Sequence, residues 1–160
     1  MRDLHDRTLI DRIANCYHTL AGEPLPCPDT VDDRSDWLDK QAPYSLLAHG
    51  NTADPCFIYA NHTALDCFGY TREAFLRLPS RLSAASPDRQ ARQLMLQRLA
   101  TEGIVYGYSG ERIPRQGEPF TIYNGVIWQL TDDKGIPWGQ GALFWLSPEA
   151  SLHSPARSAR

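Results

Sequence analysis

The sequence has no apolar run that approaches the roughly 20 residues needed to cross a bilayer. Its N-terminus, MRDLHDRTLIDR, is too charged for a secretory signal peptide. Basic residues are not in excess either, because 16 Lys and Arg stand against 19 Asp and Glu, for a net charge of −3. Proteins that bind nucleic acid usually present a basic face. These absences predict a cytoplasmic protein that contacts neither a membrane nor a nucleic acid.

The motifs of several common enzyme and metal sites are also missing. The sequence contains no GxxxxGK loop for phosphates and no nucleophile elbow. Its four cysteines, Cys16, Cys27, Cys56 and Cys67, form no CxxC pair and do not have zinc-ligand spacing with the histidines. We therefore expect no metal site, and we expect free thiols that are mostly buried, in a reducing compartment.

The patterns that are present predict one domain of the α+β class. Hydrophobic residues make up 42% of the 160 residues, enough for one core. Apolar spacing predicts a helix over 7–21, and Thr30 can cap a short second helix. Further along we expect strands at 44–49 and 56–60, short helices at 61–68 and 71–77, a longer helix from Ser86 to about Thr101, and strands at 104–113, 120–131 and 137–146. This order predicts a five-stranded antiparallel sheet covered on one face by helices, with a cleft between the two layers.

The run FTIYNGVIWQLT, 120–131, predicts a half-buried strand. Phe120, Ile122, Val126, Trp128 and Leu130 alternate with polar residues, so we expect them to share one apolar face that points towards the helices. Gln140 lies on the return strand. Whether it shares the face of Trp128 depends on the length of the DDKG loop, and the sequence leaves both arrangements open.

The stretch FIYANHTALDCFGYTREAF, 57–75, passes from a strand into two short helices. Asn61 is a natural N-cap for the first of them, and direct contact with a ligand is the alternative. Gly69 is expected to end that helix, because glycine adopts the left-handed conformation at little cost.

This stretch resembles the entry of a PAS domain, in which a strand ends at Asn, a helix carries Ala-Leu and Gly-Tyr precedes a further short helix. The closer resemblance is to the MEKHLA family, a PAS-like module, through YANHTAL, FGYTREAF, LPSRLSA, DRQARQLMLQRL, YSGERI, VIWQLTD and GQGALF. The resemblance covers residues 44–146, and the lead-in helices within 1–43 look like those of stand-alone bacterial members. Residues 147–160 are small and polar, and we expect them to be disordered.

The resemblance implies a sensory or regulatory module that binds a small molecule and signals through a partner protein. It implies no settled ligand, cofactor or activity. Light-sensing PAS modules carry a cysteine-containing signature at the start of the long helix, where this chain reads SRLSAASPDRQAR. Haem-binding PAS domains place a His near the same helix, and residues 87–102 contain none. The cofactor therefore stays unknown.

Polar residues within the matching stretches are the candidates for ligand binding. Arg81 precedes the long helix, Arg92 lies on it, and Tyr108 and Arg112 lie on the next strand. Arginines around one cleft would favour a carboxylate or a phosphate, because guanidinium binds both through paired hydrogen bonds. The alternative is that Arg81 and Arg92 pair with acidic side chains or helix-end carbonyls. The full set of candidate ligand contacts is Arg81, Arg92, Tyr108, Arg112, Trp128, Gln140 and Asn61.

Two other functions stay open. One is an interaction module without a ligand, in which helix 7–21 forms a homodimer through its apolar stripe, although that stripe could equally pack on the chain's own sheet. The other is a small enzyme with a cone-shaped α+β fold, of the isomerase or dehydratase kind, which needs a His-Asp couple in its cavity. His62 and Asp66, one helical turn apart, are the couple near the cleft. A solvent-facing imidazole would remove the base from this enzyme.

Overall fold

One antiparallel sheet forms the centre of the protein, with five strands in the order β2-β1-β5-β4-β3. The computed structural model describes residues 4–83 and 89–147, with the backbone alone for residues 4–6 and 89–92. In chain order, the strands are β1 (Ser45–Gly50), β2 (Phe57–Ala60), β3 (Ile104–Arg112), β4 (Phe120–Thr131) and β5 (Pro137–Trp145). Each strand ends within one residue of its predicted bounds. The predicted α+β class with a five-stranded antiparallel sheet is therefore confirmed.

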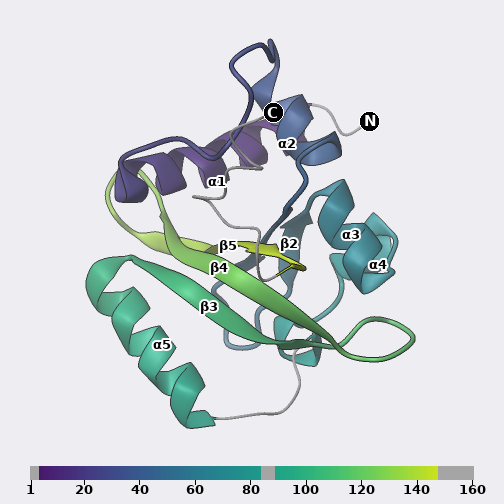
Figure 1. Ribbon diagram of the computed structural model, residues 1–160. Helices are drawn as coiled ribbons and strands as arrows, with labels where there is room; N and C mark the ends of the chain where they lie inside the picture. Colours follow the sequence, from purple (N-terminus) through teal and green to yellow (C-terminus); the bar gives the residue numbers. More distant parts are fainter. Residues whose placement is uncertain (1–3, 84–88, 148–160) are drawn as a thin grey trace.

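Helices cover both faces of this sheet (Figure 1). On one face lie α3 (His62–Phe68), α4 (Arg72–Phe75), the 3-10 turn η1 (Ser80–Ser83) and α5 (Arg89–Glu102). On the opposite face lie α1 (Leu4–Ala21) and α2 (Arg34–Lys40), which are the predicted lead-in helices. The lead-in helices thus form a second helical layer, on the face of the sheet opposite the cleft. None of the described helices is long and apolar enough to cross a membrane.

The apolar stripe of α1 packs against the sheet of its own chain. Ile10, Ile13 and Tyr17 are buried in the same cluster as Trp128. The Tyr17 and Trp128 rings meet edge-on at 5.0 Å, and the Trp128 indole N–H donates to the Ile13 carbonyl at 3.2 Å. This stripe is therefore buried within the monomer, and it is not available as the interface of a homodimer.

The start of α2 differs from the sequence prediction. Asp33, and not Thr30, is the N-cap, and its carboxylate accepts from the Asp36 amide at 3.1 Å. A turn closed by Val31 N–H on the Pro28 carbonyl occupies the segment before it. Arg7 of α1 donates to the same Asp33 carboxylate at 2.6 Å, and this hydrogen bond is the main cause that lowers the pKa of Asp33.

β4 does not present one apolar face, so that prediction is wrong. Phe120 and Ile122 pack in the cluster under α3 and α4, whereas Val126 belongs to the cluster under α1. The cause is a bulge, because the pairing of β4 with β5 shifts between Tyr123 and Val126 and Asn124 has a φ of 52°. One extra residue moves every later side chain to the other face of a strand. The strand therefore serves both cores.

Asn61 joins three elements through its side chain and is completely buried. Its Oδ1 accepts from Ala64 N–H at 3.0 Å, which makes it the N-cap of α3, and from Leu46 N–H at 3.1 Å. Its Nδ2 donates to the carbonyls of Leu38 at 2.9 Å and Tyr44 at 3.1 Å. Both donors and the acceptor of the amide are therefore used within the fold. The N-cap prediction is confirmed, and so is the left-handed Gly69 that ends α3, with a φ of 76°.

We predict that Asn61→Ala lowers the free energy of unfolding by about 4 kcal/mol, because it removes a cap and orphans buried groups of β1 and α2. Thr71→Ala is the matched control, since Thr71 caps α4 by accepting from Ala74 N–H at an exposed site. Its loss should cost about 1 kcal/mol. Urea denaturation measures both values. Equal losses in the two variants would mean that the buried bonds of Asn61 contribute nothing beyond a cap.

Candidate ligand-binding site

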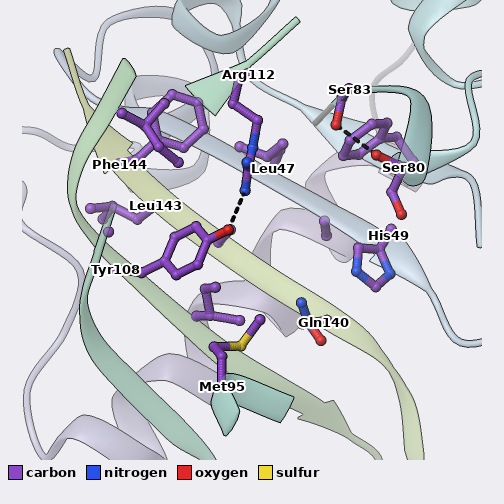
Figure 2. Close-up of a pocket in the computed structure, with 16 residues that line it drawn as sticks. Leu47, His49, Ser80, Ser83, Met95, Tyr108, Arg112, Gln140, Leu143 and Phe144 are labelled. Atoms are coloured by element: carbon purple, nitrogen blue, oxygen red, sulfur yellow. Dashed lines mark hydrogen bonds between the residues drawn. The ribbon is translucent and has the colours of Figure 1, made fainter. Parts of the chain in front are cut away.

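A cavity of about 80 Å³ lies between the sheet and the helices of the α5 face. All five strands contribute to it, Ser80 and Ser83 of η1 close one side and Met95 of α5 closes another (Figure 2). The lining residues are Leu47, Ala48, His49, Phe57, Ser80, Ser83, Met95, Tyr108, Arg112, Ile122, Gly125, Ile127, Gln140, Ala142, Leu143 and Phe144. The predicted cleft between sheet and helices therefore contains a hollow.

Small residues in the sheet create this hollow. Ala142 of β5 pairs with Leu47 of β1 on one side and with Ile127 of β4 on the other. Side chains of directly paired residues stand next to each other on one face, so a methyl group lies between two long aliphatic side chains. Gly125, at the bulge of β4, adds a second position without bulk.

The bulge in β4 also positions Tyr108. Gly125 pairs with Tyr108 of β3, and a Cβ atom on Gly125 would lie 3.0 Å from the Tyr108 carbonyl oxygen. Such a contact is tighter than nearly all Cβ contacts in proteins, so glycine favours this close approach of β4 to β3. The Tyr108 ring points into the cavity, with its hydroxyl towards the centre (Figure 2).

Arg112 folds back along β3 over the Tyr108 ring. Its guanidinium carbon lies 5.3 Å from the ring centroid, and Nη2 donates to the Tyr108 hydroxyl at 3.1 Å. Gly110 lies between the two residues along the strand. A Cβ there would lie in ordinary van der Waals contact with both side chains, 3.4 Å from the Tyr108 hydroxyl and 3.5 Å from Arg112 Nη1, so the pair lies directly over this position. The pair brings one positive charge to the edge of the cavity.

Arg112 differs from other arginines in its surroundings. Arg72 donates to the buried Asp39 carboxylate at 3.2 Å, and the exposed Arg81 pairs with Asp54 at 2.9 Å. Arg112 is half-buried, and its hydrogen bonds go to the Tyr108 hydroxyl and to a backbone carbonyl. Among the described residues no carboxylate neutralises it. A half-buried cation without a counter-ion is suited to an incoming anion.

The register settles where Gln140 lies relative to Trp128. Gln140 pairs with Gln129, whereas Trp128 pairs with Gly141, so the two side chains point to opposite faces. Gln140 lines the cavity (Figure 2), and Trp128 is fully buried under α1. The Trp128 ring lies so close to Gly141 that a Cβ there would be 2.7 Å from it.

The structure therefore brings together three of the predicted ligand contacts, Tyr108, Arg112 and Gln140. The side chains of Asn61 and Trp128 are buried and bonded within the fold, and neither they nor Arg81 line the cavity. Arg92 lies on α5, and its side chain is outside the described residues. Ser86, the predicted cap of that helix, also falls outside them, as do residues 148–160 of the predicted tail.

Sequence reasoning missed several lining residues. His49, Ser80, Ser83, Met95 and Phe57 line the cavity, although none was proposed as a ligand contact. The signal for His49 was present, since it follows Leu47 by two residues and therefore shares its face of β1. The serines carried no such signal, because a 3-10 turn in an irregular segment has no periodicity to follow.

The couple required by an enzyme of the cone-shaped kind does not reach the cavity. His62 is exposed, and its Nε2 lies 3.9 Å from Asp39. Neither His62 nor Asp66 is among the lining residues. In the part of the chain that the structure describes, no group of His, Cys, Asp and Glu could hold a metal ion.

None of the four cysteines lines the cavity, so none is placed to form a covalent adduct with a ligand there. Cys67 of α3 lies 3.6 Å from the hydroxyl of the buried Ser45 of β1. Burial raises the pKa of the Cys67 thiol, so it stays protonated at neutral pH. Its role is that of a small side chain in the core.

Comparison with known proteins identifies the family. A family model for the MEKHLA domain matches residues 7–146. The chain belongs to the MEKHLA domain family. The match includes both lead-in helices, which agrees with their packing on the sheet. A search of curated proteins found no significant match.

Solved structures show that this MEKHLA domain has a PAS-like fold. A PAS domain of a protein from Colwellia psychrerythraea is 12% identical with a TM-score of 0.63, over 76% of this chain and all of that domain. A fungal light-oxygen-voltage (LOV) photoreceptor domain is 21% identical with a TM-score of 0.53, over 85% of this chain and 87% of the other. An RNA-binding LOV receptor has a TM-score of 0.59 at 16% identity, over 78% of this chain and 37% of the receptor. PAS and LOV domains form a sensory family whose members often bind small molecules or cofactors.

Charge pairing predicts different costs for three arginine variants. Arg72→Met should lower the free energy of unfolding by about 3 kcal/mol, because it leaves Asp39 charged and buried. Arg81→Met removes an exposed pair and should cost below about 1 kcal/mol. Arg112→Met should also cost below about 1 kcal/mol, since it breaks no ion pair among the described residues. Urea denaturation at neutral pH compares the three. A large loss for Arg112→Met would show that Arg112 is a structural residue.

Proposed function

We propose that this MEKHLA domain is a cytoplasmic sensory module that binds a small anionic molecule in the cavity and signals through a partner protein. The observation that carries the proposal is Arg112, a half-buried cation that lines the cavity and has no acidic partner among the described residues. A carboxylate or phosphate oxygen would supply the missing negative charge. Tyr108 holds the guanidinium at the cavity edge, where it can meet such a group.

The cavity volume favours a compact ligand. At about 80 Å³ it offers roughly half the room of a 150 Å³ protein cavity that holds benzene. A molecule with one ring therefore fits if part of it stays outside the cavity or if a lining side chain moves. Of the lining residues, His49, Ser80 and Arg112 are partly exposed, so the cavity is not sealed from solvent. A side chain such as Met95, with three rotatable bonds, can adapt at small cost.

A route from the cavity to the opposite face supports a signalling role. Gln140 faces the cavity, and the next residue, Gly141, lies against the Trp128 ring. Trp128 in turn is bonded to the backbone of α1 through Ile13. If β5 can adopt two slightly different positions and the ligand binds better to one of them, the ligand would also shift the population of α1 between the two matching positions. A partner protein that contacts α1 could then respond.

A panel of anions tests the proposed function. We expect benzoate, cyclohexanecarboxylate or inorganic phosphate to raise the melting temperature, and neutral benzyl alcohol to do so far less. Arg112→Met should lower affinity for the effective anion at least tenfold, because it removes a charged hydrogen bond of roughly 1.5–3 kcal/mol. Ala142→Leu should also abolish binding, because its side chain fills the hollow.

Arg81→Met is the matched control for charge, since it removes one cation from an exposed site outside the cavity. It should bind the anion as the unmodified protein does. Isothermal titration calorimetry gives the affinities. Anion binding that survives both Arg112→Met and Ala142→Leu, or the absence of binding by every anion in the panel, would overturn the proposal.

A further inference from the structure

The floor of the cavity is ordered by polarity along the strands. Cross-strand pairing places His49 and Gln140, which line the cavity, in one row across β1 and β5, and Gln129 of β4 continues this row outside the cavity. Two residues further along β5, Ala142 pairs with aliphatic neighbours on both sides. Adjacent rows lie roughly 6.6 Å apart along a strand. The floor therefore changes from a polar row to an apolar row within one side-chain step.

The third row is aromatic and carries the positive charge. Phe144 lies four residues from Gln140 along β5, roughly 13 Å between the Cα atoms. The bulge of β4 lies across from Phe144, and there Gly125 pairs with Tyr108. The Arg112 guanidinium reaches this row by folding back onto the Tyr108 ring (Figure 2). The cavity thus has a cationic end, an apolar middle and a polar end.

The polar end has unused hydrogen-bonding capacity. Gln140 is half-buried and lines the cavity, and its side-chain amide makes no hydrogen bond to any described residue. A primary amide offers two donors and one carbonyl acceptor. Half-buried polar groups normally find a partner, and the cavity is the space that Gln140 faces. A ligand with a polar group at this end would supply that partner.

Two aromatic side chains, one on each side of the apolar row, favour a flat ring. Phe57 and Phe144 line the cavity and are fixed by other rings, since Phe57 stacks on Phe75 at 4.2 Å and Phe144 meets Phe68 edge-on at 6.3 Å. Aromatic walls that are already fixed bind a planar group at little entropic cost. The methyl group of Ala142 leaves the depth for it.

We infer that the ligand class is an aromatic monocarboxylate that carries a neutral hydrogen-bonding group, such as a hydroxyl, at the end opposite the carboxylate. The carboxylate lies at Arg112 and Tyr108, the ring lies over Ala142, and the hydroxyl exchanges a hydrogen bond with the Gln140 amide. This inference rests on the proposed function, because it needs Arg112 to bind an anion. It adds the ring and the second polar group, which the charge alone does not require.

Two acids of similar shape test the inference. 4-Hydroxybenzoate offers the hydroxyl, and 4-methylbenzoate replaces it with a methyl group. We expect the intact protein to bind 4-hydroxybenzoate about fivefold more tightly, as one net hydrogen bond allows. In Gln140→Met this preference should disappear or reverse. Gln129→Met is the matched control, because Gln129 is the cross-strand neighbour of Gln140 but does not line the cavity. It should keep the preference.

Titration calorimetry of the two acids with the intact protein and with each variant, together with melting curves to show that each variant is folded, separates the outcomes. Equal affinities for the two acids in the intact protein, or a preference that survives Gln140→Met, would overturn the ligand class. If Arg112→Met still abolished binding of both acids in that case, the proposed anion sensor would stand. Binding of neither acid would also overturn the ligand class, and binding that ignores Arg112→Met would overturn the proposed function with it.

Discussion

The fold depends on the side-chain amide of Asn61. This residue lies where β2 ends and α3 begins, and it is fully buried with all of its hydrogen-bonding groups satisfied by backbone atoms. Those atoms belong to the end of α2, to the start of β1 and to the first turn of α3. Leaving any of them unpaired inside the protein would cost free energy comparable to a hydrogen bond. One side-chain amide therefore connects α2, which lies on one face of the sheet, and α3, which lies on the other face, to the adjacent strands β1 and β2.

A second constraint, the bulge in β4, explains why the two faces differ. Before Asn124 the strand turns its even-numbered apolar side chains to α3 and α4, and after Gly125 it turns its even-numbered ones to α1. The face under α1 receives Trp128 and Val126 and is filled. The face under α5 keeps Gly125 and Ala142, whose lack of bulk leaves a hollow. The same irregularity thus completes one core and opens the other.

Local sequence signals predicted the helices and strands well. The features that they did not predict depend on how the strands pair. The N-cap at Asn61 and the glycine at 69 are local, because each depends on backbone within a few residues. The face of Gln140 and the change of face within β4 depend on register and on one positive φ angle, which the run FTIYNGVIWQLT does not reveal. Tyr108 and Arg112 were proposed because they are polar residues on one strand within the stretches that resemble the family. Arg81 was proposed for the same reason, but it pairs with Asp54. Residue type suggested the site, and only the pairing of strands and charges separated its members from similar residues elsewhere.

Arg112 lacks a counter-ion among the described residues, which lowers the stability of the fold, and the packing of the core does not depend on this arrangement. An arginine that stacks on one tyrosine and bonds its hydroxyl gains a weak cation–π contact and one hydrogen bond, while burying part of a charged group without a counter-ion. Gly125 gives up side-chain packing where β4 approaches the Tyr108 backbone closely. Features that reduce stability without serving the core are expected where a protein binds something else. The cationic edge of the hollow is such a feature, whereas the equally polar clusters around Asn61 and Asp39 are closed by their own partners.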